Sequence, residues 1–112
     1  MQATTADLRA SMDHIHTAPS DTAPIQMLCR RPGFGKREFL ETLPLTVAGG
    51  IPGDRWASAP WMRLADGSPD PRIQVSIIPL RVMNAVWLDR ETQPHPGDPI
   101  VADIDCSYAS LP

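Results

Sequence analysis

Apolar residues recur at helical spacing near the start of the chain, over residues 4–15, and predict a short amphipathic helix there. The next segment, residues 17–24, is rich in proline, serine, threonine and aspartate, a composition typical of a linker. We therefore expect the helix to be an appendage. The predicted organisation is a helix with a proline-rich linker, residues 1–24, followed by a domain, residues 25–112.

Beyond the linker, apolar and polar residues alternate in short runs, as they do in strands that bury one face. Pro44 interrupts one of these runs, and a helical pattern over residues 81–89 follows another. Turn-forming residues separate the runs, notably in a basic hairpin turn, 31–37, and a long loop, 57–71. The predicted strands are residues 25–30, 38–47, 72–80 and 100–106.

The segment 72–80 has the clearest strand pattern. Its apolar residues point one way and its polar residues the other, so a sheet there would have a core side and a side facing a cleft or water. The apolar set is Ile73, Val75 and Ile77, and the polar set is Arg72, Gln74 and Ser76.

These short elements and the 13 prolines favour a mainly β domain, because long helices do not tolerate dense proline. The expected fold is a partly open β-barrel with one or two short helices.

Both cysteines fall on the apolar faces of predicted strands, so Cys29 and Cys106 are interpreted as small buried hydrophobes. Two arginines follow Cys29, and a reactive thiol there is the alternative. Asp103 and Asp105 are expected on a solvated strand face, because two carboxylates alone make a poor metal site. We therefore predict no metal site.

The segment 49–56 contains three glycines and a proline, which exclude a helix or a central strand. It ends in Asp54, Arg55 and Trp56. One interpretation is a turn buttressed by an Asp–Arg pair. The other is a rigid corner that displays its charged groups for binding.

The formal net charge of −3 and the pI near 5.4 argue against nucleic acid as a partner, because its binders usually carry a basic face. The chain contains no apolar run of the roughly 18 residues that a membrane span needs. The first ten residues lack the basic and apolar regions of a secretory signal, so a cytoplasmic location is expected.

Three segments follow one another in a recognisable order and spacing. They are Gly53-Asp54-Arg55-Trp56, the run from Arg72 to Ile78, and Gly97-Asp98 leading into the run from Ile100 to Asp105 and a Leu-Pro end. Together they resemble the MOSC domain family, named for the C-terminal domain of molybdenum-cofactor sulfurases, and the resemblance covers about residues 25 to 112.

The resemblance implies a MOSC-type partly open β-barrel, here incomplete, and a role in binding the molybdenum cofactor (molybdopterin) or carrying sulfur. It implies a pyridoxal-phosphate-dependent cysteine desulfurase or a redox partner. The family's key cysteine lies beyond residue 112, so the chain is expected to be truncated before it. The alternative is a non-catalytic fragment or protein-interaction module that self-associates through open sheet edges.

Under the cofactor-binding hypothesis, the cofactor site comprises six residues. Arg55 would face the anion, because a guanidinium can hold phosphate through two parallel hydrogen bonds. Asp54 would orient Arg55 or close the turn, and the polar face of 72–80 would add donors. The six are Gly53, Asp54, Arg55, Arg72, Gln74 and Ser76.

Overall fold

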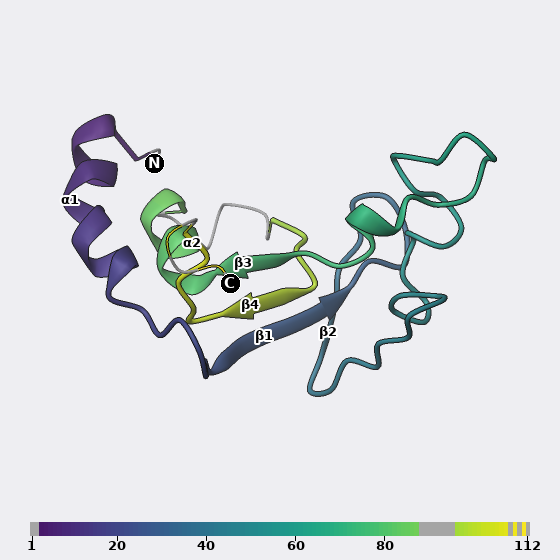
Figure 1. Cartoon of the computed structure of the whole chain (residues 1–112), viewed down its shortest axis with the longest axis horizontal. Coiled ribbons are helices and arrows are strands. Elements are labelled where there is room, and N and C mark those ends of the chain that lie inside the picture. The colour runs from purple at the N-terminus through teal and green to yellow at the C-terminus, as the bar shows by residue number, and fades with distance from the viewer. Residues whose placement is uncertain (1–2, 88–95, 108, 110, 112) are drawn as a thin grey trace. The chain divides into compact units, whose positions relative to one another are not determined.

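The computed structural model describes residues 3–87, 96–107, 109 and 111. These residues form a small mixed α/β structure with two α-helices and a four-stranded sheet (Figure 1). The strand order is β2-β1-β4-β3, so within the described residues the sheet has two edges and does not close into a barrel. The elements are α1 (Thr5–His16), β1 (Ile25–Arg30), β2 (Glu38–Leu40), β3 (Ile77–Pro79), α2 (Leu80–Val86) and β4 (Ile100–Ala102).

The chain divides into two compact units. One comprises Met1–Gln26, Ile78–Pro96 and Val101–Pro112, and the other comprises Met27–Ile77 and Gly97–Ile100. We call them the helical unit and the loop unit. The boundaries fall inside β1, β3 and β4, so each of these strands begins in one unit and ends in the other.

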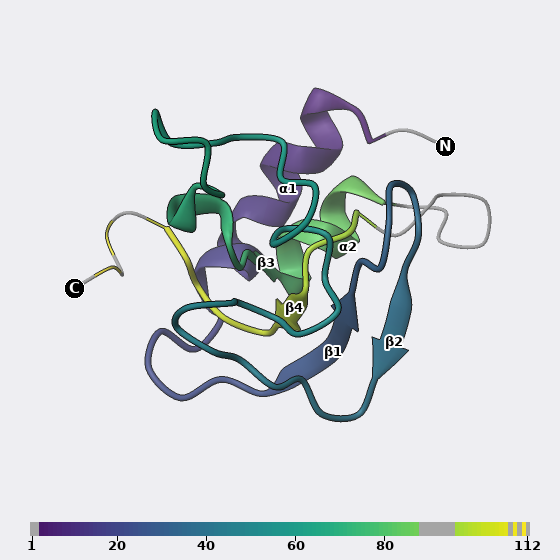
Figure 2. The ribbon, with the colours of Figure 1, turned by 90° about the vertical axis from the view of Figure 1, so that its right-hand side faces the viewer.

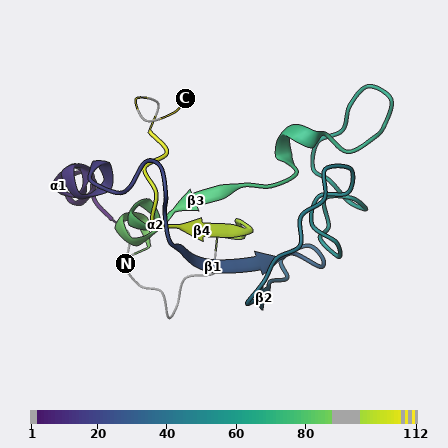
Figure 3. The same cartoon turned by 60° about the horizontal axis from the view of Figure 1, so that its bottom comes forward.

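In the helical unit, α1 confirms the predicted N-terminal helix. Thr4 caps it by accepting a hydrogen bond from the backbone N–H of Asp7, and the Asp7 carboxylate accepts one from the N–H of Thr4. The helix contacts α2, which confirms the predicted helix after Pro79 up to Val86 (Figure 3). Residues 88 and 89 of that prediction lie outside the described residues.

The guanidinium of Arg81, on α2, joins separate parts of the helical unit. It donates to the Asp103 carboxylate at 2.9 Å, to the carbonyl of His14 at 2.7 Å and to the Thr17 hydroxyl at 2.9 Å. The predicted linker is also tied down, because Asp103 and Asp105 donate backbone hydrogen bonds to the carbonyls of Pro24 and Pro19. The end of α1 is therefore anchored by side-chain and backbone bonds.

The hairpin of β1 and β2 confirms the predicted strand 25–30 and the turn 31–37 (Figure 2). The strands are antiparallel, with Cys29 opposite Phe39 and Arg30 opposite Glu38. The strand predicted within 38–47, with an interruption at Pro44, is present as the edge strand β2, which is shorter than expected because it ends at Leu40. A separate turn follows at Thr46–Gly50.

The predicted strand 72–80 is wrong over its first half. Asp70 caps a single 3-10 turn, Pro71–Ile73, by accepting the backbone N–H of Arg72, and the proline occupies the first turn. Gln74 is also in the helical region, with φ −65° and ψ −44°. The strand begins only at Ile77, so the polar residues of this segment do not share a strand face.

The predicted strand 100–106 is also shorter in the structure, because β4 ends at Ala102. β4 lies between β1 and β3, and both Val101 and Ala102 are buried. The chain then turns, as Ile104 donates to the carbonyl of Ala102, and the expected alternation of faces ends there. Asp105 is buried and Cys106 is exposed, so the predictions of a solvated Asp105 and a core Cys106 are wrong.

The buried apolar residues of the loop unit include Cys29, Ile51 and Trp56. The glycine-rich segment 49–56, which we call the glycine turn, therefore packs against the core of that unit. No helix among the described residues has the length and apolar character needed to cross a bilayer.

Candidate functional site

The glycine turn is a closed corner in the loop unit. Thr46 and Gly50 exchange backbone hydrogen bonds of 2.7 and 2.8 Å, and Gly50 has a φ of +68°. The Gln74 side chain packs across this turn and donates to the carbonyl of Val47 at 3.0 Å. A Cβ on Gly50 would lie 2.7 Å from the Gln74 Cγ, so glycine at this positive φ lets Gln74 pack here without shifting.

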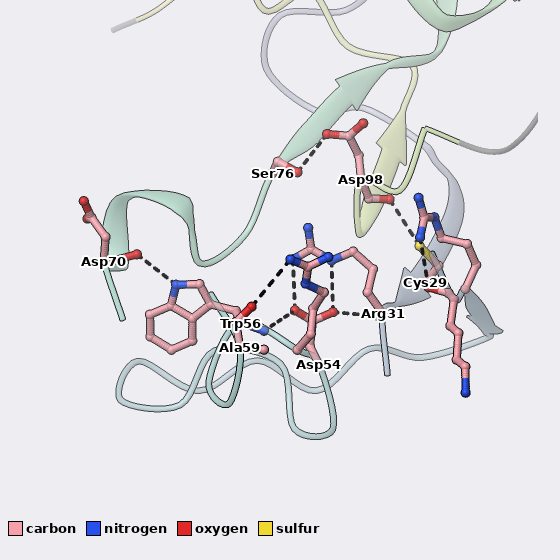
Figure 4. Close-up of polar contacts among 11 residues, drawn as sticks. Cys29, Arg31, Asp54, Trp56, Ala59, Asp70, Ser76 and Asp98 are labelled. Atoms are coloured by element: carbon pink, nitrogen blue, oxygen red, sulfur yellow. Dashed lines mark hydrogen bonds and ion pairs between the residues drawn. The ribbon is translucent and has the colours of Figure 1, made fainter. Parts of the chain in front are cut away.

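The carboxylate of Asp54 pairs with Arg31 and not with Arg55. It accepts the backbone N–H of Arg31 at 2.6 Å and the Arg31 Nε and Nη2 at 3.1 and 2.9 Å (Figure 4). The backbone N–H of Trp56 is a further donor, at 3.2 Å. The prediction that Asp54 orients Arg55 is therefore wrong, and Asp54 instead clamps the start of the hairpin loop 31–37.

The environment of Asp54 favours its ionised form. Burial opposes ionisation, but the hydrogen bonds from the Arg31 side chain, the Arg31 backbone and the Trp56 backbone outweigh it and lower the pKa of the carboxyl. Its side chain is only 1% exposed and that of Arg31 is 20% exposed. The Arg31–Asp54 ion pair is therefore largely buried and supports the fold, unlike an ion pair on the surface.

Arg55 has a different set of contacts. Its backbone N–H donates to the carbonyl of Arg31 at 2.7 Å, and its Nη2 lies 3.5 Å from the carbonyl of Ala59. Its Cζ lies 5.4 Å from the centre of the Phe34 ring. Among the described residues no carboxylate forms an ion pair with Arg55. The arginines that do have carboxylate partners are Arg30, Arg31, Arg72 and Arg81.

The other predicted site residues have separate partners. Arg72 forms a two-pronged pair with Asp70. The Ser76 hydroxyl donates to the Asp98 carboxylate at 2.7 Å (Figure 4). Gly53 has a φ of +83° and supports the Arg30 guanidinium, whose Nη1 would lie 2.9 Å from a Cβ there. The structure thus assigns each of them a local contact, and their common role in cofactor binding stays a prediction.

Arg37 is the residue of this region that the sequence interpretation did not single out. Its Nε is buried and has no hydrogen-bond partner among the described residues, while its Nη1 donates to the carbonyl of Lys36 at 3.0 Å. Its guanidinium packs on Gly97, where a Cβ would lie 2.7 Å from Nη2. The basic flanks of the 31–37 turn were the signal available in the sequence.

Cys29 is fully buried in β1, as predicted. Its thiol donates to the carbonyl of Asp98 at 3.3 Å. Burial raises the pKa of the Cys29 thiol, although the charges of Arg37 and Arg31 oppose the rise. A buried thiol with a raised pKa is a poor nucleophile, so the structure favours the core interpretation of Cys29 over the reactive one.

Within the described ranges no three or more His, Cys, Asp or Glu side chains are grouped to hold a metal ion. Comparisons of the chain with protein-family models, with curated proteins and with solved structures each find no match.

Proposed function

We propose that the chain is the N-terminal portion of a MOSC-type partly open barrel, and that it binds an oxyanionic cofactor of the molybdopterin class beside the loop 31–37. The observation that carries the proposal is the presence, on Arg55 and Arg37, of guanidinium donors that no carboxylate of the described residues neutralises. Most other arginines with contacts in the loop unit are paired, so these two retain capacity for an external anion.

The residues present fit an oxyanion. Arg55 has unused N–H groups that suit a phosphate or molybdate oxygen, and Arg37 adds a second guanidinium that forms no ion pair with a carboxylate of the described residues. Asp54 and Arg31 hold the base of the loop to the backbone of Arg55. In this proposal the Arg31–Asp54 pair positions the loop, and Arg55 and Arg37 bind the anion.

A bound molybdenum cofactor would supply a metal centre for redox or sulfur chemistry. In the loop unit, the proposed role of the residues is to bind and orient the anionic group, because Cys29 is buried and not placed as a nucleophile. By the same resemblance, the proposed partner is a pyridoxal-phosphate-dependent cysteine desulfurase or a redox protein.

The test is calorimetric titration of the protein with molybdate and with ribose 5-phosphate as simple oxyanion probes. Because a charge-assisted hydrogen bond contributes roughly 1.5–3 kcal/mol, we expect Arg55→Ala to weaken binding about tenfold or more, and Arg37→Ala to weaken it as well. Arg9→Ala, on the exposed surface of α1, removes the same charge and should leave binding unchanged. Equal binding by all four proteins, or no binding at all, would overturn the proposal.

A second candidate function is a protein-interaction module, and exposed apolar side chains of the loop unit favour it. Phe39 on the edge strand β2 and Val47 on the glycine turn face solvent, the latter at 97% exposure, as do Leu45 and Trp61. Under this alternative the chain self-associates at the sheet edge. Sedimentation equilibrium would then show a dimer that Phe39→Glu dissociates. A monomer at every concentration tested would exclude it.

A further inference from the structure

Phe34 lies at the tip of the hairpin loop 31–37 with its ring almost fully in solvent, at 90% exposure. One partner of the ring is the guanidinium of Arg55, at 5.4 Å from the ring centre. An aromatic ring that contacts a cation and still presents most of its surface to water is suited to stacking with a second planar group.

The backbone around Phe34 is held in one conformation. The N–H of Lys36 donates to the carbonyl of Gly33 at 3.1 Å, which closes a four-residue turn with Phe34 as its second residue. Gly35, the third residue, has a φ of +72°, a value that suits glycine at this position of the turn. At its start the loop is fixed by the bonds of Arg31 to Asp54 and Arg55. The ring is therefore presented on an ordered turn.

The turn that carries this ring is basic. Its fourth residue, Lys36, is exposed, and Arg55 at the ring has no carboxylate partner among the described residues. Arg31 does not add to the charge, because Asp54 neutralises it. A ligand that matches both features has a planar ring for Phe34 and an anionic group for the cations.

We propose that Phe34 is a stacking platform for a planar heteroaromatic ring, and that it makes this site prefer ring-bearing phosphate esters over simple oxyanions. The inference rests on the proposed function, since it takes Arg55 as the anion-binding group, and it adds the class of ligand and the residue that selects it.

The test compares two phosphate esters that differ by a ring, guanosine 5'-monophosphate (GMP) and ribose 5-phosphate. Guanine shares its aminopyrimidinone ring with pterins and is soluble enough for calorimetry as the monophosphate. Stacking of a base on an aromatic side chain changes affinity by about tenfold, so wild type should bind GMP about tenfold more tightly than ribose 5-phosphate.

Three variants separate stacking from a structural role of Phe34. Phe34→Leu should bring the GMP affinity down to that of ribose 5-phosphate and leave the latter unchanged, whereas Phe34→Trp should keep the preference. Trp61→Leu, which removes another exposed aromatic side chain of the loop unit, should change neither affinity.

The outcomes distinguish this inference from the function on which it rests. If both esters bind with equal affinity and Arg55→Ala weakens both, the anion site stands and the stacking platform is wrong. If Phe34→Leu weakens both esters equally, Phe34 only buttresses Arg55, and the inference is again wrong. If neither ester binds wild type, both the proposed function and the inference fall.

Discussion

Arg31 binds the carboxylate of Asp54 through its backbone N–H and two guanidinium nitrogens, across 23 positions of sequence. This pair joins the hairpin loop 31–37 to the glycine turn. It leaves Arg55, the sequence neighbour of Asp54, without a carboxylate partner in the described part of the chain. The division of roles between these two arginines underlies both proposals, and it can be tested through stability.

Asp54→Asn should lower the free energy of unfolding by about 2 to 3 kcal/mol, because it leaves a largely buried guanidinium unpaired. The partial exposure of Arg31 places this cost below that of breaking a fully buried pair. The control is Glu38→Gln, which breaks the more exposed Arg30–Glu38 pair and should cost little. Urea denaturation measures both. A cost for Glu38→Gln equal to that for Asp54→Asn would contradict the burial argument.

The stability of the protein should fall on acidification, in part through Asp54. The pKa of this carboxyl is lowered in the folded state, so its contribution is present above the unfolded pKa of about 4 and is lost as pH falls through the folded pKa. In the Asp54→Asn variant, the free energy of unfolding should fall less steeply with pH below pH 5 than in wild type. Urea denaturation at each pH measures it. Parallel curves for wild type and variant would argue against a depressed pKa.

The indole of Trp56 should contribute through its hydrogen bond as well as its packing. Its Nε1 donates to the carbonyl of Asp70 at 2.8 Å in a buried setting. Trp56→Phe keeps an aromatic ring but removes this bond, leaving the carbonyl with the backbone N–H of Ile73 at 3.2 Å, and should cost about 0.5–1.5 kcal/mol in urea denaturation. Trp61→Phe, at an exposed position, should be within experimental error of wild type. A larger loss of stability for Trp61→Phe than for Trp56→Phe would show that the Trp56 indole does not make this buried hydrogen bond.

The two cysteines should differ sharply in reactivity. Cys106 is exposed, whereas Cys29 is buried and burial raises the pKa of its thiol. With a chromogenic disulfide reagent, native protein should release one equivalent quickly and the second only on unfolding. Cys106→Ser should abolish the fast phase, and a fast phase that survived this substitution would place the Cys29 thiol in contact with solvent.

Gly50 and Gly67 both have positive φ but different surroundings. A Cβ on Gly50 would lie 2.7 Å from the Gln74 Cγ and 3.3 Å from the Trp56 ring, whereas a Cβ on Gly67 meets nothing within 4 Å. Both alanine variants should lose about 1 kcal/mol to backbone strain, and Gly50→Ala should lose more because of the clash. Thermal denaturation compares them. Equal losses would mean that Gln74 moves aside freely.

Sequence patterns predicted the elements whose causes are local. The N-terminal helix, the β1 strand and the hairpin that follows it depend on residues close in the chain, and the structure confirms each. The break in 72–80 was also signalled locally, because Asp70 followed by Pro71 is a typical helix start, but the alternation of the next residues masked it. Arg37 was overlooked because the partner of its guanidinium, Gly97, lies far along the chain.

The sequence by itself determined where the chain can form a capped helix, a hairpin and a glycine corner, since adjacent residues set backbone conformation. Only the tertiary structure decided that Asp54 binds Arg31, and that Asp105 is buried while Cys106 faces solvent. Alternation predicts which residues share a face while a strand lasts. It cannot predict where the strand ends or which distant group satisfies a buried charge, because those depend on contacts brought together by folding.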